Sequence, residues 1–303
     1  MTFVNKIKSK LLSPQFILGA AVLFLAIICV YPFLSLFEKV LFPEGSLSFK
    51  YFSKVLSSKS TLTALKNTLI MSIGTALLSL FLAIPLSWLL TRTDIPNQSR
   101  WRSLFCLPYA IPPYIGAMAW IYLGNPTNGI FNKLLGTSIL NIYTTSGLIW
   151  VMGSFFYTFI LLSLLAALDR MDPSLEEAAR LSGANPFQVF FHITLPIIFP
   201  SLMSGVLLVL LASAASFGVP AMIGNPAGIF LITTKIYTYQ RMGSLSGIFM
   251  AGALSSLLLI LAMLVLVVNQ KVLSRNGFKT VGGKTSRPSV IHLRSAKWPL
   301  YIL

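Results

Sequence analysis

Six long runs of apolar residues, separated by short polar segments, constrain the fold of this chain more than any other feature of its sequence. A helix needs about 20 predominantly apolar residues to cross a lipid bilayer. The runs occupy residues 16–36, 69–90, 104–123, 148–168, 197–222 and 248–269. Because unpaired backbone groups are costly in lipid, runs of this length are expected to be helical. The predicted fold class is an all-α membrane protein with a bundle of six transmembrane helices.

Composition agrees with this class, since 55% of the residues are hydrophobic and only 10% are charged. Soluble domains have about a quarter of their residues charged. The formal net charge of +16 would indicate nucleic-acid binding in a soluble protein. Here the basic residues lie at the ends of the apolar runs, where membrane topology places them. The expected partner is therefore the lipid bilayer, and no nucleic acid is expected.

Lysines and arginines predict the orientation of the bundle, because cytoplasmic loops are enriched in them. With six spans, basic residues gather on the side that holds the N-terminus, the second and fourth loops and the tail: Lys6, Lys8, Lys10, Arg92, Arg100, Arg102, Arg170 and Arg180. That side is predicted to be the cytoplasm, with both termini on it. The first external loop opposes this assignment with four lysines, at positions 39, 50, 54 and 59. The first run lacks a small-residue cleavage site and is expected to remain as a membrane anchor.

Prolines interrupt the third and fifth runs, at positions 108, 112, 113, 200 and 220. Each proline removes a backbone donor, so these runs are expected to be kinked and packed against neighbouring helices. Cys29 and Cys106 fall inside different runs and are expected to be free apolar thiols.

The loop of residues 172–196 contains two helix-start signals separated by a glycine. Asp172 before Pro173 predicts a helix start, with acidic residues in the early turns where the helix dipole favours them. Arg180 follows Glu176 by four residues and Glu177 by three, a spacing that allows local ion pairs. Gly183 is expected to end this helix in a left-handed conformation.

A second helix is predicted from residue 186 toward residue 193. Asn185 and Pro186 repeat the starting signal, with Gln188 three residues after the cap. Pro196 is then expected to open the fifth span. Three aromatic residues lie on one face of the second helix: Phe187, Phe190 and Phe191. The unit is a predicted cytoplasmic helix-turn-helix with an aromatic ridge.

Two interpretations of this loop remain open from its pattern. It could be an amphipathic segment lying on the membrane surface. Glu176 and Glu177 oppose that interpretation, because anionic lipid repels acidic residues. A protein partner accounts for both the acidic and the aromatic residues, since aromatic anchors with charged flanks are typical of a helix bound in a groove.

The loop also resembles a known signature. Glu177-Ala178-Ala179, then Gly183, then Ile193-Thr194-Leu195-Pro196 is similar to the EAA motif of permease subunits in binding-protein-dependent ABC importers. Every position of the motif is matched, and Ser182 stands where many members have aspartate before the glycine. The resemblance extends over residues 60–270. It implies a coupling helix that binds a groove of a cytoplasmic ATPase, with the polar contact made by Glu177 and Arg180.

The resemblance implies a set of ATPase-coupling residues: Glu176, Glu177, Ala178, Ala179, Arg180, Gly183, Phe187, Phe190, Ile193, Leu195 and Pro196. It also implies the partners, namely an ATPase dimer that binds ATP-Mg, an external or periplasmic solute-binding protein and a second permease half. This chain would bind no cofactor and would not itself be an enzyme. Its expected location is the bacterial cytoplasmic (inner) membrane, in a multi-pass arrangement.

Two further stretches, residues 107–124 and 216–237, resemble iron(III)-type permeases. Iron(III) is therefore the expected solute, with polyamine, thiamine and phosphonate as alternatives. Such permeases often fuse two six-helix halves. The tail, residues 271–303, has seven basic residues from position 271 to 297 and resembles the linker to a second half. The expected organisation is an N-terminal anchor and external loop (1–59), a transmembrane domain (60–270) and this tail (271–303).

The predicted spans contain no acidic residue or histidine, so a dedicated metal site in the solute path is not expected. His192 and His292 lack metal-ligand partners at suitable spacing. Asn67 could cap the second span or line a gate, and capping is the favoured interpretation. Ser213 and Ser216 could line the path or bond to the preceding helical turn.

Two other classes of membrane protein fit the sequence less well. A membrane-embedded enzyme would need a nucleophile with a base, paired acids or a metal cluster, and the sequence contains none of these arrangements. An ion-coupled secondary transporter is expected to have charged residues at mid-membrane and an internal repeat, which are also lacking. The secondary transporter remains the more distant alternative.

Overall fold

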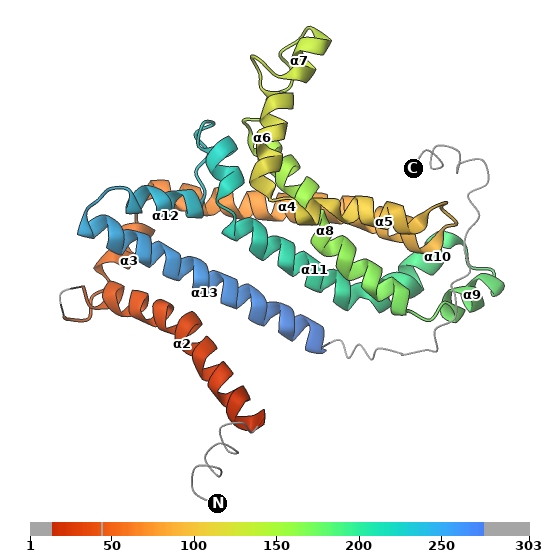
Figure 1. Cartoon of the computed structure of the whole chain (residues 1–303), viewed down its shortest axis with the longest axis horizontal. Coiled ribbons are helices and arrows are strands. Elements are labelled where there is room, and N and C mark those ends of the chain that lie inside the picture. The colour runs from red at the N-terminus through yellow and green to blue at the C-terminus, as the bar shows by residue number, and fades with distance from the viewer. Residues whose placement is uncertain (1–13, 44, 276–303) are drawn as a thin grey trace, which may run out of the picture. The chain divides into compact units, whose positions relative to one another are not determined.

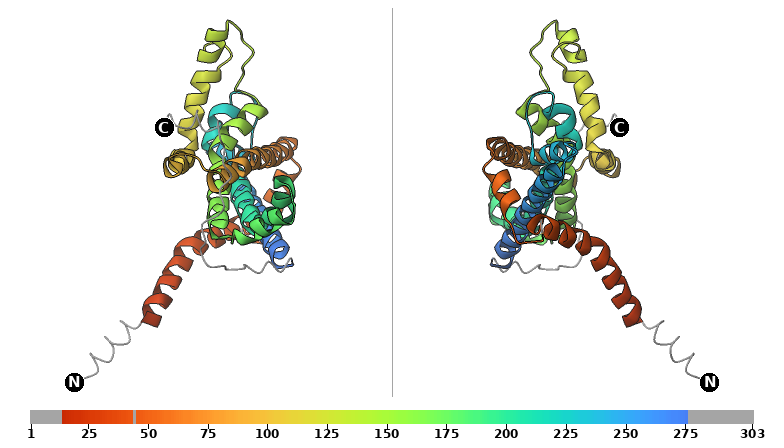
Figure 2. Two further views of the ribbon diagram at one scale, coloured as in Figure 1. Left: turned by 90° about the vertical axis from the view of Figure 1, so that its right-hand side faces the viewer. Right: turned by 90° about the vertical axis from the view of Figure 1, so that its left-hand side faces the viewer.

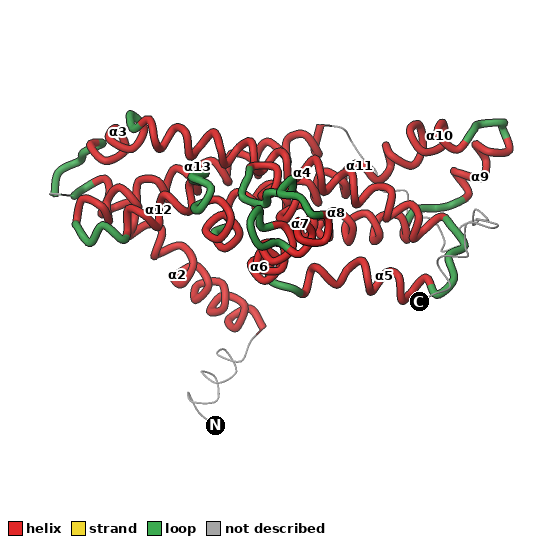
Figure 3. The backbone as a smooth tube through the Cα atoms, turned by 90° about the horizontal axis from the view of Figure 1, so that it is seen from above, coloured by secondary structure: helices red, strands yellow, loops and turns green. Residues whose placement is uncertain are grey.

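A computed structural model describes residues 14–43 and 45–275, and all regular elements in these residues are helices (Figure 1). The elements in chain order are α2 (Pro14–Leu41), α3 (Lys50–Leu56), α4 (Lys59–Arg92), α5 (Gln98–Cys106), η1 (Leu107–Ala110), α6 (Pro113–Gly124), α7 (Ile130–Leu135), α8 (Thr145–Arg170), α9 (Ser174–Leu181), α10 (Pro186–Val189), η2 (Phe190–Thr194), α11 (Leu195–Ala215), η3 (Pro220–Gly224), α12 (Ile232–Gln240) and α13 (Leu245–Arg275). In the described residues, the segments between the helices are loops and turns (Figure 3). The N-terminal lysines and most of the predicted basic tail lie outside the described residues.

Within residues 14–43 and 45–275, five helices are long and apolar enough to cross a membrane, and a bent pair makes a sixth span if its two parts are counted together. The predicted first, second, fourth and sixth spans are found as α2, α4, α8 and α13. Each is longer than its apolar run, because polar residues extend the helices at one or both ends. The all-helical prediction is confirmed. The third and fifth spans are also helical, but they differ from the predicted shape and bounds.

The third span is not one straight helix. Residues Gln98–Ala110 and Pro113–Gly124 meet at an angle of 95°. A residue before proline is disfavoured in helical conformation, and two such positions follow one another here. Ile111 (ψ 123°) and Pro112 (ψ 128°) are accordingly extended. The pair of prolines therefore produces a break, where the sequence had indicated only a kink.

The fifth span begins earlier and ends earlier than predicted. The helix is continuous over Pro186–Ala215, so Pro196 does not open a new helix. The turn before it is a π-helix, η2, in which the N–H of Leu195 donates to the carbonyl of Phe190. A wider turn fits the position, because proline cannot donate to the preceding turn and its ring needs space there. The span ends at Ala215, and residues 216–231 form a separate segment containing η3.

Helices α8 and α11 pack closely within a core that extends over residues 71–231. The buried residues of α11 recur every three or four positions, at Ile198, Leu202, Gly205, Val209 and Ser213, which gives one buried face. A Cβ at Gly205 would lie 2.8 Å from the Cα of Ile160 in α8. Glycine therefore allows these two backbones to approach one another.

Helices α6 and α7 extend away from α4, α8 and α11 (Figures 1 and 2). Between this arm and α8, the Trp120 and Trp150 rings meet edge to face with centroids 5.5 Å apart. At its far end, the amide of Asn132 donates to the carbonyls of Asn125 and Leu140 at 3.0 and 2.7 Å. These bonds order the turn that returns the chain to α8.

A second compact unit combines the described residues of 14–61 with residues 236–260. Within it, the rings of Tyr51 and Phe249 lie 5.0 Å apart, and the hydroxyls of Thr61 and Tyr239 are 3.2 Å apart. Gly252 of α13 lies against Val40 of α2, where a Cβ would come within 2.6 Å of its side chain. The C-terminal end of α2 is therefore packed against the N-terminal part of α13, although the two helices are far apart in the sequence.

Candidate functional site

The loop between α8 and α11 forms two helices, as the sequence predicts. The side chain of Asp172 accepts a hydrogen bond from the N–H of Ser174 at 2.9 Å. This bond holds the pKa of the Asp172 carboxyl below its usual value. The negative charge lies beside the N-terminus of α9, where the helix dipole favours it. Helix α9 begins at Ser174, one residue later than the proline signal indicates.

Gly183 ends α9 in the predicted left-handed conformation, with φ +87°. The N–H of Gly183 donates to the carbonyl of Arg180, and the N–H of Ala184 donates to the carbonyl of Ala179, each at 3.0 Å. This pair of bonds defines a Schellman motif, which satisfies carbonyls left free at a helix end. The turn between the two helices is therefore set by the backbone and not by a packed side chain.

Asn185 and Gln188 form the predicted capping box at the start of α10. The N–H of Gln188 donates to the Asn185 side chain at 2.9 Å, and the N–H of Asn185 donates to the Gln188 side chain at 2.8 Å. Two backbone donors that a helix N-terminus leaves free are satisfied reciprocally. The direction in which the chain enters α10 and the fifth span is thereby determined locally.

A buried ion pair joins α9 to the end of α4. Arg92 Nε donates to Glu176 Oε2 at 2.9 Å, and the two side chains are only 1% and 4% exposed. Both terminal nitrogens of Arg92 donate to the Leu168 carbonyl at 3.3 Å. The Thr194 hydroxyl donates to Glu176 Oε1 at 2.7 Å. Four segments, α4, α8, α9 and η2, therefore meet at one guanidinium and one carboxylate.

This arrangement differs from the local pairing that the sequence suggested. Among the described residues, Glu176 is ion-paired with Arg92 and not with Arg180. The Glu176 side chain is buried and bonded to the end of α4, so in this structure it positions α9. Residues available at the surface of the helix-turn-helix include Ala178, Gly183, Phe187 and Pro196, while Glu177, Ala179, Arg180, Phe190, Ile193 and Leu195 are half-buried.

The aromatic ridge borders a groove against α4. Phe187, Phe190 and Phe191 line a cavity of about 310 Å³ together with Pro186, Ile84, Pro85 and Trp88. The rings of Phe190 and Phe191 meet edge to face at 5.1 Å. Phe187 is 77% exposed, the largest apolar side chain presented by α10. The ridge thus has an inner side facing α4 and an outer side that is free in this chain.

A second, more exposed ion pair lies near the same end of the bundle. Arg102 of α5 donates to both carboxylate oxygens of Asp169 in α8, at 2.8 and 2.9 Å, and the side chains are 30% and 45% exposed. In the sequence, Arg92 and Arg102 are topology signals, and neither Asp169 nor Thr194 of the EAA motif is marked as a polar partner. Positions so far apart in the sequence offered no signal that they would meet.

The three residues selected for a solute path have structural contacts. Asn67 lies inside α4, eight residues after its start, so its predicted capping role is wrong. Its amide donates to the Phe230 carbonyl at 3.1 Å. Ser213 is fully buried, and its hydroxyl donates to the Leu210 carbonyl at 3.1 Å. The carbonyl of Ser216 accepts a bond from Thr233 at 2.7 Å. The bonds of Asn67 and Ser216 hold the segment after α11, whereas the Ser213 bond lies within α11 and joins the preceding helical turn.

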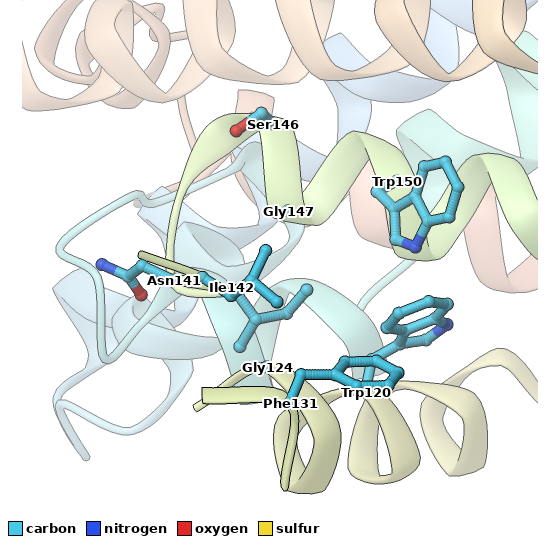
Figure 4. Close-up of a pocket in the computed structure, with 9 residues that line it drawn as sticks. Trp120, Gly124, Phe131, Asn141, Ile142, Ser146, Gly147 and Trp150 are labelled. Atoms are coloured by element: carbon cyan, nitrogen blue, oxygen red, sulfur yellow. The ribbon is translucent and has the colours of Figure 1, made fainter. Parts of the chain in front are cut away.

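An apolar cavity of about 480 Å³ lies at the opposite end of α8, beside α6 (Figure 4). Trp120, Phe131, Ile142 and Trp150 form most of its wall, and Asn141 and Ser146 supply polar groups. No group of three or more His, Cys, Asp or Glu residues that could bind a metal occurs within residues 14–43 and 45–275.

Comparison with known proteins defines the class. A family model described as the inner membrane component of binding-protein-dependent transport systems matches residues 98–272, more than half of the chain. The chain belongs to this family. It is therefore a multi-pass component of the inner membrane and not an ATPase. The matched region includes the whole helix-turn-helix and Thr194, which is bonded to Glu176, but not Arg92.

Individual relatives and a solved structure show how much of the chain is matched. The sulfate transport system permease protein CysT of Escherichia coli (strain K12) is 25% identical over 266 residues, which cover 88% of this chain and 94% of that protein. The ferric transport system permease protein FbpB of Actinobacillus pleuropneumoniae is 26% identical over 290 residues, 93% of this chain but only 42% of FbpB. A crystal structure of a bacterial alginate ABC transporter matches the fold with a TM-score of 0.72 at 20% identity, over 93% of this chain and 99% of that one.

Proposed function

We propose that this chain is the transmembrane permease of an ATP-driven importer, which passes a solute from an external binding protein into the cytoplasm by alternating access. The observation that supports this most is the helix-turn-helix of residues 172–196. It presents Phe187 and the start of α10 outward while a buried ion pair attaches α9 to the bundle. A surface that binds a partner and is rigidly joined to membrane helices suits the transfer of movement from an ATPase.

The partners follow from this proposal. The ATPase binds ATP-Mg and contacts the coupling residues at the surface of α9 and α10, with Glu177 and Arg180 in the polar contact and Phe187 and Phe190 in the apolar contact. A solute-binding protein docks on the other side of the membrane. A second permease half completes the path, and the alignment with less than half of FbpB supports such a partner. ATP hydrolysis belongs to the ATPase subunit, and this chain binds no cofactor.

Two inorganic ions are candidate solutes. Iron(III) is favoured by the resemblance of residues 107–124 and 216–237 to iron(III)-type permeases and by the ferric relative FbpB. Sulfate is the second candidate, because the sulfate permease CysT aligns over nearly its full length. An anion would meet little negative charge along α4, α11 and α13, which contain no acidic residue, while Glu38 of α2 and Asp169 of α8 lie near the ends of their helices. Polyamine, thiamine and phosphonate remain alternatives from sequence resemblance alone.

The proposal is tested by uptake into proteoliposomes that contain the chain with its second half and its ATPase. Radiolabelled iron(III) and radiolabelled sulfate are supplied separately, each in the presence of the importer's solute-binding protein. The expected result is uptake of one ion that requires both ATP and the binding protein. Uptake that depends on an ion gradient and not on ATP would instead establish the secondary-transporter alternative.

A further inference from the structure

Arg92, Glu176 and Thr194 form a buried polar cluster at the end of α4. Direct contact with an ATPase does not account for it, because the cluster is buried. Glu176 lies next to the EAA motif, yet its side chain points into the protein and is only 4% exposed. Each of its carboxylate oxygens has a separate partner, Arg92 on Oε2 and Thr194 on Oε1. Because the side chain is buried, the carboxylate is not accessible to another subunit in this structure.

The cluster connects segments that follow different membrane helices. Arg92 is the last residue of α4, and the Leu168 carbonyl lies near the end of α8. Thr194 is the last residue of η2, directly before α11. Glu176 belongs to α9, which contains the start of the coupling motif. A displacement of α9 is therefore shared at once by the ends of three membrane helices.

Arginine is suited to this position in a way that lysine is not. The guanidinium presents a planar set of donors, and here Nε is directed to Glu176 while Nη1 and Nη2 are directed to Leu168. The helix-end carbonyl of Leu168 would otherwise lack a partner in the last turn of α8. One side chain thus neutralises the buried carboxylate and caps a neighbouring helix.

We infer that Arg92, Glu176 and Thr194 are positioning residues that transmit movement of α9 to α4, α8 and α11, so that ATP hydrolysis is coupled to solute passage. This inference rests on the proposed function. The cluster does not contact the ATPase or the solute. It determines instead whether α9 moves with the membrane helices or independently of them.

The first test measures the coupling ratio, the number of solute molecules imported per ATP hydrolysed, in the proteoliposomes described above. Glu176→Gln keeps the size of the side chain but leaves the charge of Arg92 uncompensated, so the ratio is expected to fall about tenfold. Arg92→Lys is expected to lower it similarly, because an ammonium cannot reach both partners. Assembly with the ATPase should persist, since its contact surface is unchanged.

Matched variants separate positioning from general stability. Thr194→Val removes only the hydroxyl and should lower the coupling ratio, whereas Thr194→Ser keeps the hydroxyl and should preserve it. Asp169→Asn breaks the exposed ion pair near the same end of the bundle and should leave the ratio within about twofold of the unmodified chain. The double variant Arg92→Met with Glu176→Met buries no unpaired charge and should couple better than Glu176→Gln.

The second test does not depend on transport. Hydrogen exchange of the full chain in lipid nanodiscs should show faster exchange in residues 174–181 for Glu176→Gln, with residues 145–165 unchanged. If the unmodified chain shows no ATP-driven uptake, the proposed function fails, and the exchange result still decides whether the cluster holds α9. The inference is wrong if Glu176→Gln matches Asp169→Asn in coupling ratio, if uptake falls only in proportion to inserted protein, or if exchange in α9 is unchanged.

Discussion

Gly183 occupies a backbone conformation that other residues rarely adopt, and open space surrounds the position where a Cβ would lie. A Cβ at this position therefore meets no steric barrier beyond the local backbone. The energetic cost of a substitution is then the cost of the left-handed conformation alone. Asparagine tolerates this conformation better than other non-glycine residues, and β-branched residues tolerate it least.

Gly183→Val is therefore expected to destabilise the turn between α9 and α10 by about 1–2 kcal/mol. The protein should insert normally, because the apolar spans are untouched, while ATP-driven uptake per inserted molecule should fall. Gly183→Asn is the matched control and should retain most of the uptake. Immunoblots of the membrane fraction measure insertion, and proteoliposome assays measure uptake. Equal uptake by the two variants would show that the φ of Gly183 does not matter.

At the scale of elements, the contact between α8 and α11 shows how glycine places two helices close together. The atom nearest to a Cβ at Gly205 is a backbone atom, Ile160 Cα at 2.8 Å, which cannot move without the helix moving. At Gly19 in α2, by contrast, no atom lies within 4 Å. The same substitution at these two glycines should consequently have effects of opposite sign.

Gly205→Ala is expected to destabilise the chain by about 1–3 kcal/mol, because α8 and α11 must separate. Gly19→Ala should be neutral or slightly stabilising, since alanine favours a helix by up to about 1 kcal/mol over glycine. Thermal unfolding of the detergent-solubilised protein, followed by circular dichroism, measures both. A Gly205→Ala protein that unfolds at or above the midpoint of the unmodified chain would contradict the close approach seen here.

The break between η1 and α6 is a second feature of elements that prolines determine. Replacing both Pro112 and Pro113 with alanine restores two backbone donors and removes the restriction on the preceding residues. The two helices should then merge. The distance between spin labels at positions 103 and 122 should then increase toward about 28 Å, the length of 19 residues of straight helix.

This distance is measured by electron–electron double resonance in a background without Cys29 and Cys106. The unmodified chain should give a clearly shorter distance, because the two segments meet at 95°. If the double variant retains the shorter distance, tertiary packing and not the proline pair holds the bend.

At the scale of the whole chain, the side of the membrane on which each polar segment lies is tested with two exposed positions that flank α8. Ser182 in the coupling segment and Thr137 beyond α7 are both exposed, and α8 lies between them in the sequence. A single crossing by α8 must put the two positions on opposite sides. The enrichment of arginine around α9 further predicts that Ser182 faces the cytoplasm.

Single cysteines at these positions, in a chain without Cys29 and Cys106, test this arrangement in intact cells. A membrane-impermeant maleimide should label Thr137→Cys from outside and should label Ser182→Cys only after the membrane is opened. Labelling of both positions from outside would refute the single crossing. Labelling of Ser182→Cys alone would reverse the predicted orientation.

Local sequence rules were sufficient for much of this protein. The length of each apolar run identified α2, α4, α8 and α13, because lipid requires helices with internally paired backbones. The glycine turn and the capping box were equally predictable, since both depend on residues within a few positions of one another. Errors at this level also had local causes. The consecutive prolines broke the third span, and Pro196 was accommodated inside a helix by a π-turn.

Contacts between distant segments followed no such rule. Helical spacing suggested that Glu176 would pair with Arg180 four residues away, whereas its partner is Arg92, 84 residues earlier. Asn67 resembled a helix cap and instead bonds to Phe230, 163 residues later. The sequence alone determined which segments are helical and where they turn, because those choices depend on neighbouring residues and on the lipid. Only the tertiary structure decided which charges are buried together, because burial depends on how the ends of α4, α8, α9 and η2 pack in space.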